Sequence, residues 1–455
     1  MNKKLSMILC TTVASSLLFT VIPNINEVQA ATTNTTQVNT QNQKTKSINI
    51  KKYQFNITRE NGTNSLIIPN ATKIIYYKDN NGKRINVKTF KSNKYGQISG
   101  KITVPKNVKR VYVEHILKTS NNEMLLNKDR NVVKLYSHIN LSKNNIINKV
   151  DKGTMGNPVS KRNLNWTYVK VWQEYFNFIN DQKTAVNYTV DQLNKKGYKN
   201  IAKYKSKPSK IVFENSNKEA GLSVYSVSKT QNDLKKGDRY QLIKLPIIQN
   251  STNYNSFSDR VKVFVAHEYS HWQMVQAVGA KNIRTPEGYK NHSSYNKNEI
   301  VSWKEGYALL NANRYPWKFN MNGNLDIKVQ TSQKVNPKYG AREKLYGKST
   351  NYTVFNILRD IYDPMNGIEG SNDRYNIAED VLGKGKYTQD QLEKLSNGLM
   401  YITMRDSKAK NLSEYIQYID KHYVKNHKEF YKILKLNGLT KDGKFTLNEN
   451  NKKIN

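Results

Sequence analysis

Hydrophobic and polar positions alternate with a period of two in short runs along the N-terminal part of the chain. Turn signals such as Asn81-Gly82 and Tyr95-Gly96 separate these runs. Short alternating strands at this spacing are typical of two packed sheets. We therefore predict an all-β sandwich domain, similar to transthyretin-like or immunoglobulin-like modules, over residues 48–140. Its strands are expected at 53–58, 73–77, 84–90, 97–104, 110–117 and 132–136.

The period changes from two to the helical value after residue 164. Trp172, Phe176 and Ile179 recur at intervals of three and four residues, which predicts a helix from about residue 165 and a second one over 184–196. Strand-like runs follow at 210–214, 222–228 and 240–247. The mixture predicts an α+β domain over residues 164–437. Further helices are expected at 298–313, 352–363, 389–404, 411–423 and 429–434, with a polar loop or lid at 314–347.

The helix that carries the candidate chemistry lies between these strands and the later helices. Ser256 and Asp259 resemble a capping box at its start, and Gly279 is expected to end it. Its apolar stripe consists of Val261, Phe264, Val265, Val275 and Val278.

The remaining segments lack either pattern. Residues 1–30 have the charged start, apolar run and small-residue cleavage site of a secretory signal peptide, so we predict an extracellular protein. Residues 31–47 are predicted to be a disordered linker, and 141–163 the connection between the domains. Residues 438–455 are predicted to be a C-terminal tail. No membrane span is expected in the mature chain.

The formal net charge is +39, and the chain has one cysteine, Cys10, inside the predicted signal peptide. The mature chain therefore has no disulfide or thiolate ligand, which leaves His, Asp and Glu as metal ligands. The lysines are scattered rather than clustered, so we expect a solvated basic surface with electrostatic association with anionic cell-wall polymers and no dedicated nucleic-acid site.

His267 and His271 are four residues apart, so they lie on one face of the predicted helix. That spacing brings both imidazoles to a single Zn²⁺ ion, with Glu268 beside them as general base. Two buried histidines with no metal are the alternative. A catalytic zinc site needs a third protein ligand and an open position for water.

Glu305, Glu299 and His292 are the candidates for that third ligand. Glu305 lies in a Trp-x-Glu-Gly-x-Ala segment, Trp303 to Ala308, on the next predicted helix. With this segment the sequence resembles the gluzincin metallopeptidases, in particular the collagenase-like and "peptidase MA-like" members. The resemblance implies a zincin-like domain with one catalytic Zn²⁺ held by His267, His271 and Glu305.

The resemblance also implies roles for more distant residues. The strand before the zinc helix would be an edge that pairs with an extended substrate, which involves Tyr240, Leu242 and Lys244. Asp360 or Asp363 would orient a zinc ligand, although either could instead cap a loop. Apart from the resemblance, the hydrolysis needs a donor that stabilises the oxyanion, and the candidates for it are Tyr362, Tyr352 and Tyr307. A Ca²⁺ loop is a further possibility, with ligands from Asp363, Asn366, Glu369 and Asp373.

The sequence thus predicts a secreted zinc metallopeptidase that hydrolyses peptide bonds of a protein or peptide substrate, with water activated by Glu268. The main alternative is a non-catalytic binding protein, adhesin or toxin component on a metallopeptidase scaffold. A polyanion binder driven by charge alone is the third hypothesis.

Overall fold

A computed structural model describes the chain from residue 44 to residue 454, with gaps. The predicted signal peptide and most of the predicted 31–47 linker lie outside the described residues, as do Tyr240, His292 and the predicted strand at 222–228. The described ranges are 44–59, 65–121, 123–127, 131–141, 145–155, 164–204, 210–214, 242–246, 254–283, 295–317, 346–363 and 375–454.

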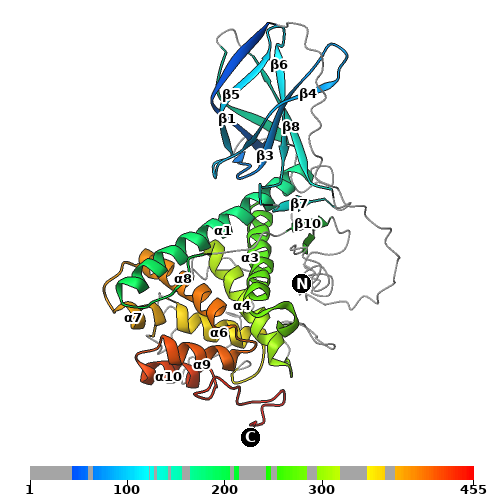
Figure 1. Cartoon of the computed structure of the whole chain (residues 1–455). Helices are drawn as coiled ribbons and strands as arrows, with labels where there is room; N and C mark the ends of the chain where they lie inside the picture. The colour runs from blue at the N-terminus through cyan, green and yellow to red at the C-terminus, as the bar shows by residue number, and fades with distance from the viewer. Residues whose placement is uncertain are drawn as a thin grey trace, which may run out of the picture.

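The fold is mixed α+β, with a β-rich N-terminal part and a helical C-terminal part (Figure 1). Two four-stranded sheets form the β-rich part. One has the order β4-β3-β6-β8, and all of its neighbours are antiparallel. In the other, β1 pairs with β2, β5 and β9. The strands are β1 (Thr45–Arg59), β2 (Ser65–Leu66), β3 (Thr72–Lys78), β4 (Arg84–Lys91), β5 (Gln97–Pro105), β6 (Arg110–Ile116), β8 (Lys134–Asn140) and β9 (Ile146–Met155).

The inward side chains of strand β1 show how the sequence sets this packing. The buried side chains are first at even positions, Ile48 and Ile50, and then at odd positions, Tyr53, Phe55 and Ile57. The alternation of buried and exposed residues therefore changes phase between Ile50 and Tyr53. The register with β5 shifts at the same point, so a bulge corrects the phase and keeps both groups in the core. The Phe55 ring stacks on His115 of the opposite sheet at 4.7 Å, and this contact joins the two sheets.

Strand β9 corrects the predicted connection at 141–163. Residues 146–155 run parallel to β1 along most of its length instead of forming a linker. β1 itself begins at Thr45, inside the segment predicted to be disordered. The β-rich part therefore extends beyond both ends of the predicted 48–140 domain.

Helix α1 (Leu164–Lys195) connects the sandwich to the helical part. It is one continuous helix where the sequence predicts two. Trp172 Nε1 donates to Pro69 O at 2.7 Å, and Gln173 Oε1 accepts from Ile67 N at 2.9 Å. These bonds attach α1 to the end of the sandwich.

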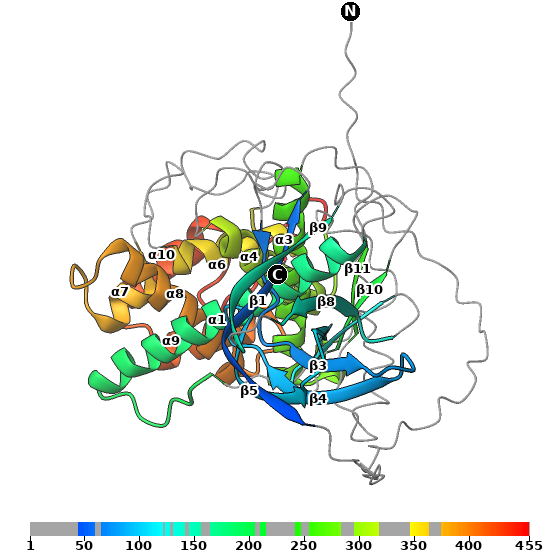
Figure 2. The ribbon, with the colours of Figure 1, turned by 90° about the horizontal axis from the view of Figure 1, so that it is seen from above.

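The helical part is built around α3 (Tyr254–Val278) and α4 (Glu299–Trp317), which pack along each other (Figure 2). The start of α3 at Tyr254 places Ser256 and Asp259 inside the helix, so the predicted capping box is wrong. Gly279 ends α3 as predicted, because its φ of +90° favours glycine. The other elements are η1 (Ala280–Ile283), α6 (Asn351–Tyr362), α7 (Ile377–Leu382), α8 (Gln389–Ser407), α9 (Leu412–His422) and α10 (His427–Leu436).

Gly306 lies where α4 and α6 pack closely against each other. A Cβ atom at this position would lie 2.5 Å from Val354 Cβ and 2.8 Å from Asn351 O. Only glycine lets the backbones approach this closely. Since Gly306 follows Glu305 directly, the crossing of α6 fixes the part of α4 that carries this carboxylate.

A small parallel sheet lies beside α3. Its order is β11-β10-β7, from β7 (Met124–Leu126), β10 (Lys210–Glu214) and β11 (Leu242–Pro246). β11 is at the end of this order and contacts α3. Strands β10 and β11 confirm two of the strands predicted before the helix.

The predicted tail at 438–455 packs on the helical part. Leu439 and Phe445 are both 5% exposed, and Leu447 forms a parallel bridge with Lys348. Among the described helices, none has the length and apolar character needed to cross a bilayer.

Candidate metal centre

Helix α3 brings the two predicted histidines to one point. His267 and His271 lie one turn apart, and their Nε2 atoms are 3.2 Å from each other. The opposite face of α3 packs on α1, where Tyr269 contacts the rings of Tyr175 and Phe178 edge-on. The helix is thus held from behind and presents both imidazoles toward α4.

Helix α4 brings Glu305 to the same point. Glu305 Oε2 lies 3.4 Å from His267 Nε2 and 3.3 Å from His271 Nε2. The helix is buried on every side between Val301 and Ala312, so packing fixes its rotation. The side chains of His267, His271 and Glu305 are 14%, 7% and 12% exposed, which leaves the cluster nearly enclosed but reachable.

The three atoms form a nearly equilateral triangle that can be compared with a zinc site. Zinc–ligand bonds of about 2.0–2.1 Å at tetrahedral angles separate the ligand atoms by about 3.3–3.4 Å. The triangle has sides of 3.2, 3.3 and 3.4 Å. Two imidazole nitrogens and one carboxylate oxygen are also a donor set that Zn²⁺ accepts. The residues therefore fit a zinc ion with one open position.

Glu268 lies beside this triangle. Its Oε1 is 3.9 Å from His267 Nε2, and its side chain is 3% exposed. His267, Glu268 and His271 offer ligand atoms within 4.8 Å of one another, a grouping that could hold a metal ion. Glu305 Oε2 is closer to His267 Nε2 than Glu268 Oε1 is, at 3.4 Å against 3.9 Å, so Glu305 is better placed to act as a ligand.

Lys304 contributes a buried charge that no sequence pattern singled out. Its Nζ lies 3.6 Å from Glu305 Oε1, the oxygen that does not face the histidines. Burial by itself raises the pKa of the Glu305 carboxyl. The charge of His271, hydrogen bonds from both rings and Lys304 outweigh burial and hold that pKa well below 4.5. The carboxylate is therefore ionised. Its Oε2 faces the two imidazoles, and its Oε1 faces Lys304.

Behind the site, a buried amide network connects three helices. Gln182 of α1 hydrogen-bonds to Gln273 of α3 and, at 3.4 Å, to Asn311 of α4. Gln273 follows His271 by two residues and therefore points away from the metal face. The network fixes α3 relative to α4, and this relation sets the distance between the histidines and Glu305.

The alternative third ligands are placed differently. Glu299 lies in the first turn of α4, where burial raises the pKa of its carboxyl and Lys444 partly opposes the rise. It has no hydrogen bond or ion pair to the two histidines among the contacts of the described residues. His292 lies outside the described residues.

Of the three candidate donor tyrosines, Tyr362 is the one whose prediction needs correction. Its side chain is fully buried, and its hydroxyl lies 2.6 Å from the Tyr415 hydroxyl and 2.9 Å from Thr403 Oγ1. A hydroxyl engaged in the core in this way is unsuited to binding substrate. Tyr307 and Tyr352 are buried on α4 and α6, and their role stays a prediction.

The predicted supporting residues lie on or next to α6. Asp360 Oδ2 accepts from Asn437 Nδ2 at 2.8 Å, and its Oδ1 is 3.5 Å from Arg359. Asp363 caps the C-terminus of α6, where its N–H donates to Arg359 O. Their support of a zinc ligand stays a prediction. The other predicted Ca²⁺ ligands, Asn366, Glu369 and Asp373, lie outside the described residues.

The predicted substrate edge falls partly within the structure. Leu242 and Lys244 belong to β11, which pairs in parallel with β10 and has no second neighbour among the described strands. Tyr240 lies outside the described residues. Pairing of β11 with a substrate stays a prediction.

Comparison with known proteins adds no further information. No protein-family model matches the chain, and no match was found among the curated proteins or the solved structures.

Proposed function

We propose that this protein is a secreted zinc-dependent metallopeptidase with a zincin-like catalytic domain. The observation that carries the proposal is the triangle of His267 Nε2, His271 Nε2 and Glu305 Oε2, whose sides match a tetrahedral zinc site. The resemblance of the His-Glu-x-x-His and Trp-x-Glu-Gly-x-Ala segments to gluzincins supports the same function.

His267, His271 and Glu305 would hold the ion. A Zn²⁺ ion in this position supplies Lewis acidity, which polarises a water molecule and the scissile carbonyl. Glu268, whose Oε1 lies 3.9 Å from His267 Nε2, would accept a proton from the attacking water. Glu268 would then donate this proton to the leaving amine nitrogen, which regenerates the carboxylate. The 3% exposure of Glu268 keeps bulk water away from this transfer.

The test separates zinc binding from catalysis. Glu268→Gln removes the base and keeps the three ligands, so we expect retained zinc and loss of peptide hydrolysis. Glu305→Gln removes a ligand, so we expect both zinc content and peptide hydrolysis to fall. Glu299→Gln is the matched control on the same helix. Its zinc content and its peptide hydrolysis should stay at the wild-type level.

Zinc content is measured by elemental analysis, and hydrolysis by mass spectrometry of a mixed peptide library with and without chelator. Wild-type turnover in Glu268→Gln would remove this residue from the mechanism. Stoichiometric zinc without cleavage of any peptide by the wild-type chain would favour the alternative, a binding protein or toxin component on a metallopeptidase scaffold.

A further inference from the structure

Lys304 is a buried cation that lies against a proposed metal ligand. Its side chain is 7% exposed, and lysine is rarely buried to this degree unless its charge is paired. Lys170 is buried as deeply, but it pairs with Glu174 of its own helix α1, a residue that has no part in the metal centre. The Nζ atom of Lys304 lies 3.6 Å from Oε1 of Glu305, so its charge acts on the metal centre directly.

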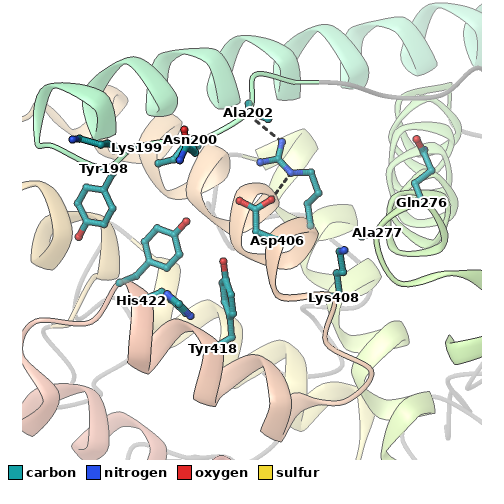
Figure 3. Close-up of a pocket in the computed structure, with 13 residues that line it drawn as sticks. Tyr198, Lys199, Asn200, Ala202, Gln276, Ala277, Asp406, Lys408, Tyr418 and His422 are labelled. Carbon is teal, nitrogen blue, oxygen red and sulfur yellow. Dashed lines mark hydrogen bonds and ion pairs between the residues drawn. The ribbon is translucent and has the colours of Figure 1, made fainter.

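Arg405 is a useful comparison, because its ion pair is remote from the metal centre. Its Nε lies 2.7 Å from Asp406 Oδ1, and its Nη1 donates to Ala202 O at 3.1 Å, beside a cavity of about 570 Å³ (Figure 3). None of the residues assigned to the metal centre lines this cavity. The ion pair of Lys304, in contrast, includes a carboxylate of the metal centre itself.

The position of Lys304 on α4 does not by itself produce this contact. Adjacent residues of a helix are rotated by about 100° from each other, and their side chains do not face each other. The side chain of Lys304 must therefore turn toward Glu305 to bring the two charges together. Because α4 is buried on every side between Val301 and Ala312, the ammonium group lies against this carboxylate instead of in bulk water.

The two oxygens of Glu305 consequently have different neighbours. Oε2 lies 3.4 Å from His267 Nε2 and 3.3 Å from His271 Nε2, whereas Oε1 lies toward Lys304. An ion bound by the two imidazoles would therefore meet one oxygen of this carboxylate. Carboxylates can also bind a metal ion through both oxygens. In that arrangement the second oxygen would take the position that a catalytic zinc site keeps open for water.

We propose that Lys304 is a positioning residue, which holds Oε1 of Glu305 away from the zinc ion and so keeps one coordination position open. This inference rests on the proposed function, because it concerns the same zinc site. The charge of Lys304 also opposes the binding of a divalent cation nearby. Loss of the charge therefore has two effects that both strengthen zinc binding: less repulsion of the ion, and a second carboxylate oxygen that is free to bind it.

The test compares neutral and charged substitutions of Lys304 on the full chain. Lys304→Met removes the charge and keeps most of the volume, and Lys304→Gln is a second neutral variant. Lys304→Arg keeps the charge. Ser302→Ala is the matched control, because Ser302 is fully buried on the same helix and its Oγ lies 2.9 Å from Ser349 Oγ. It removes a buried polar group without touching Glu305.

Zinc affinity is measured by chelator competition, and peptide hydrolysis with the same peptide library. The coordination of the ion is measured by X-ray absorption and by the visible spectrum of the Co²⁺-loaded protein, which weakens when a ligand is added to a tetrahedral site. We expect the neutral variants to bind zinc roughly tenfold more tightly than wild type, to show one more oxygen neighbour and to lose most of their hydrolysis. Lys304→Arg and Ser302→Ala should keep the wild-type coordination.

A purely structural role of Lys304 predicts the opposite change in zinc affinity, because a disturbed helix α4 would weaken zinc binding. Weaker zinc binding in the neutral variants, or wild-type coordination of their ion, would therefore overturn the inference. The same holds if Lys304→Arg shows the coordination of the neutral variants. Each of these results leaves zinc bound to the wild-type chain and the proposed function intact. A wild-type chain that binds no zinc would overturn the proposed function and the role of Lys304 together.

Discussion

The crossing of α4 and α6 at Gly306 gives a quantitative test of how the metal centre is held. A Cβ atom added by Gly306→Ala would lie 2.5 Å from both Val354 Cβ and Val354 Cγ1. Ordinary carbon–carbon contacts are about 3.5–4.0 Å, so the helices must separate locally by about 1 Å. Overpacking of this kind costs about 1–3 kcal/mol, and the better helix propensity of alanine returns about 1 kcal/mol.

We therefore expect a net loss of up to about 2 kcal/mol in stability, together with weaker zinc binding. Zinc–ligand distances vary by only about 0.2 Å in intact sites, so a 1 Å shift beside Glu305 should weaken zinc binding by about tenfold or more. Chelator competition measures zinc affinity, and thermal unfolding without metal measures stability.

Gly398→Ala is the matched control. A Cβ atom at Gly398 would collide with Thr189 and with Ala185 O, where α8 crosses α1. This variant should lose comparable stability and bind zinc with wild-type affinity. Equal loss of zinc affinity in the two variants would refute the link between the α4–α6 crossing and the site, and so would unchanged zinc affinity in Gly306→Ala.

Two further predictions concern buried polar groups. Tyr362→Phe should lower the free energy of unfolding by about 1–2 kcal/mol, because it removes hydrogen bonds to Thr403 and Tyr415. Peptide hydrolysis per folded molecule should stay unchanged. A hundredfold loss of turnover in a folded variant would restore Tyr362 as a donor. Burial lowers the pKa of Lys73 from 10.5 to about 7. Between these pH values the unfolded chain binds more protons than the folded chain. The free energy of unfolding should therefore rise with pH, by at most about 1.4 kcal/mol per pH unit. Lys73→Met should flatten this rise in urea unfolding series from pH 6 to 10, and an unchanged slope would contradict the assignment.

Local pattern predicts the elements that carry the site. The apolar stripe and Gly279 locate α3, and its helical period places His267 and His271 on one face. The Trp-x-Glu-Gly-x-Ala segment points to Glu305, and the structure brings its Oε2 to both rings. The requirement for Gly306 follows from α6, which contacts α4 from a distant part of the chain, and no local pattern contains this information.

The wrong sequence-based predictions also concern contacts between residues that are distant in the sequence. Residues 146–155 are polar enough to resemble a connection, but they form β9 because β1 offers a parallel partner. The sequence predicts two helices where α1 is continuous. Residues 180–183 lie between them and are polar; Asn180, Asp181 and Lys183 are exposed, whereas Gln182 is buried against Gln273. The burial of Lys73 also follows from no local pattern: it shares the inward face of β3 with Ile75, and its Nζ donates to Gly96 O at 2.8 Å. Each outcome depends on a partner distant in sequence.

X-ray absorption at the zinc edge, on the full chain loaded with zinc, tests the metal centre most directly. We predict one ion with two imidazole nitrogens at about 2.0–2.1 Å and a carboxylate oxygen at about 2.0–2.2 Å, and loss of the oxygen contribution or of zinc itself in Glu305→Gln. A wild-type chain that binds no stoichiometric zinc, or a Glu305→Gln variant with the same spectrum and zinc content as wild type, would contradict it.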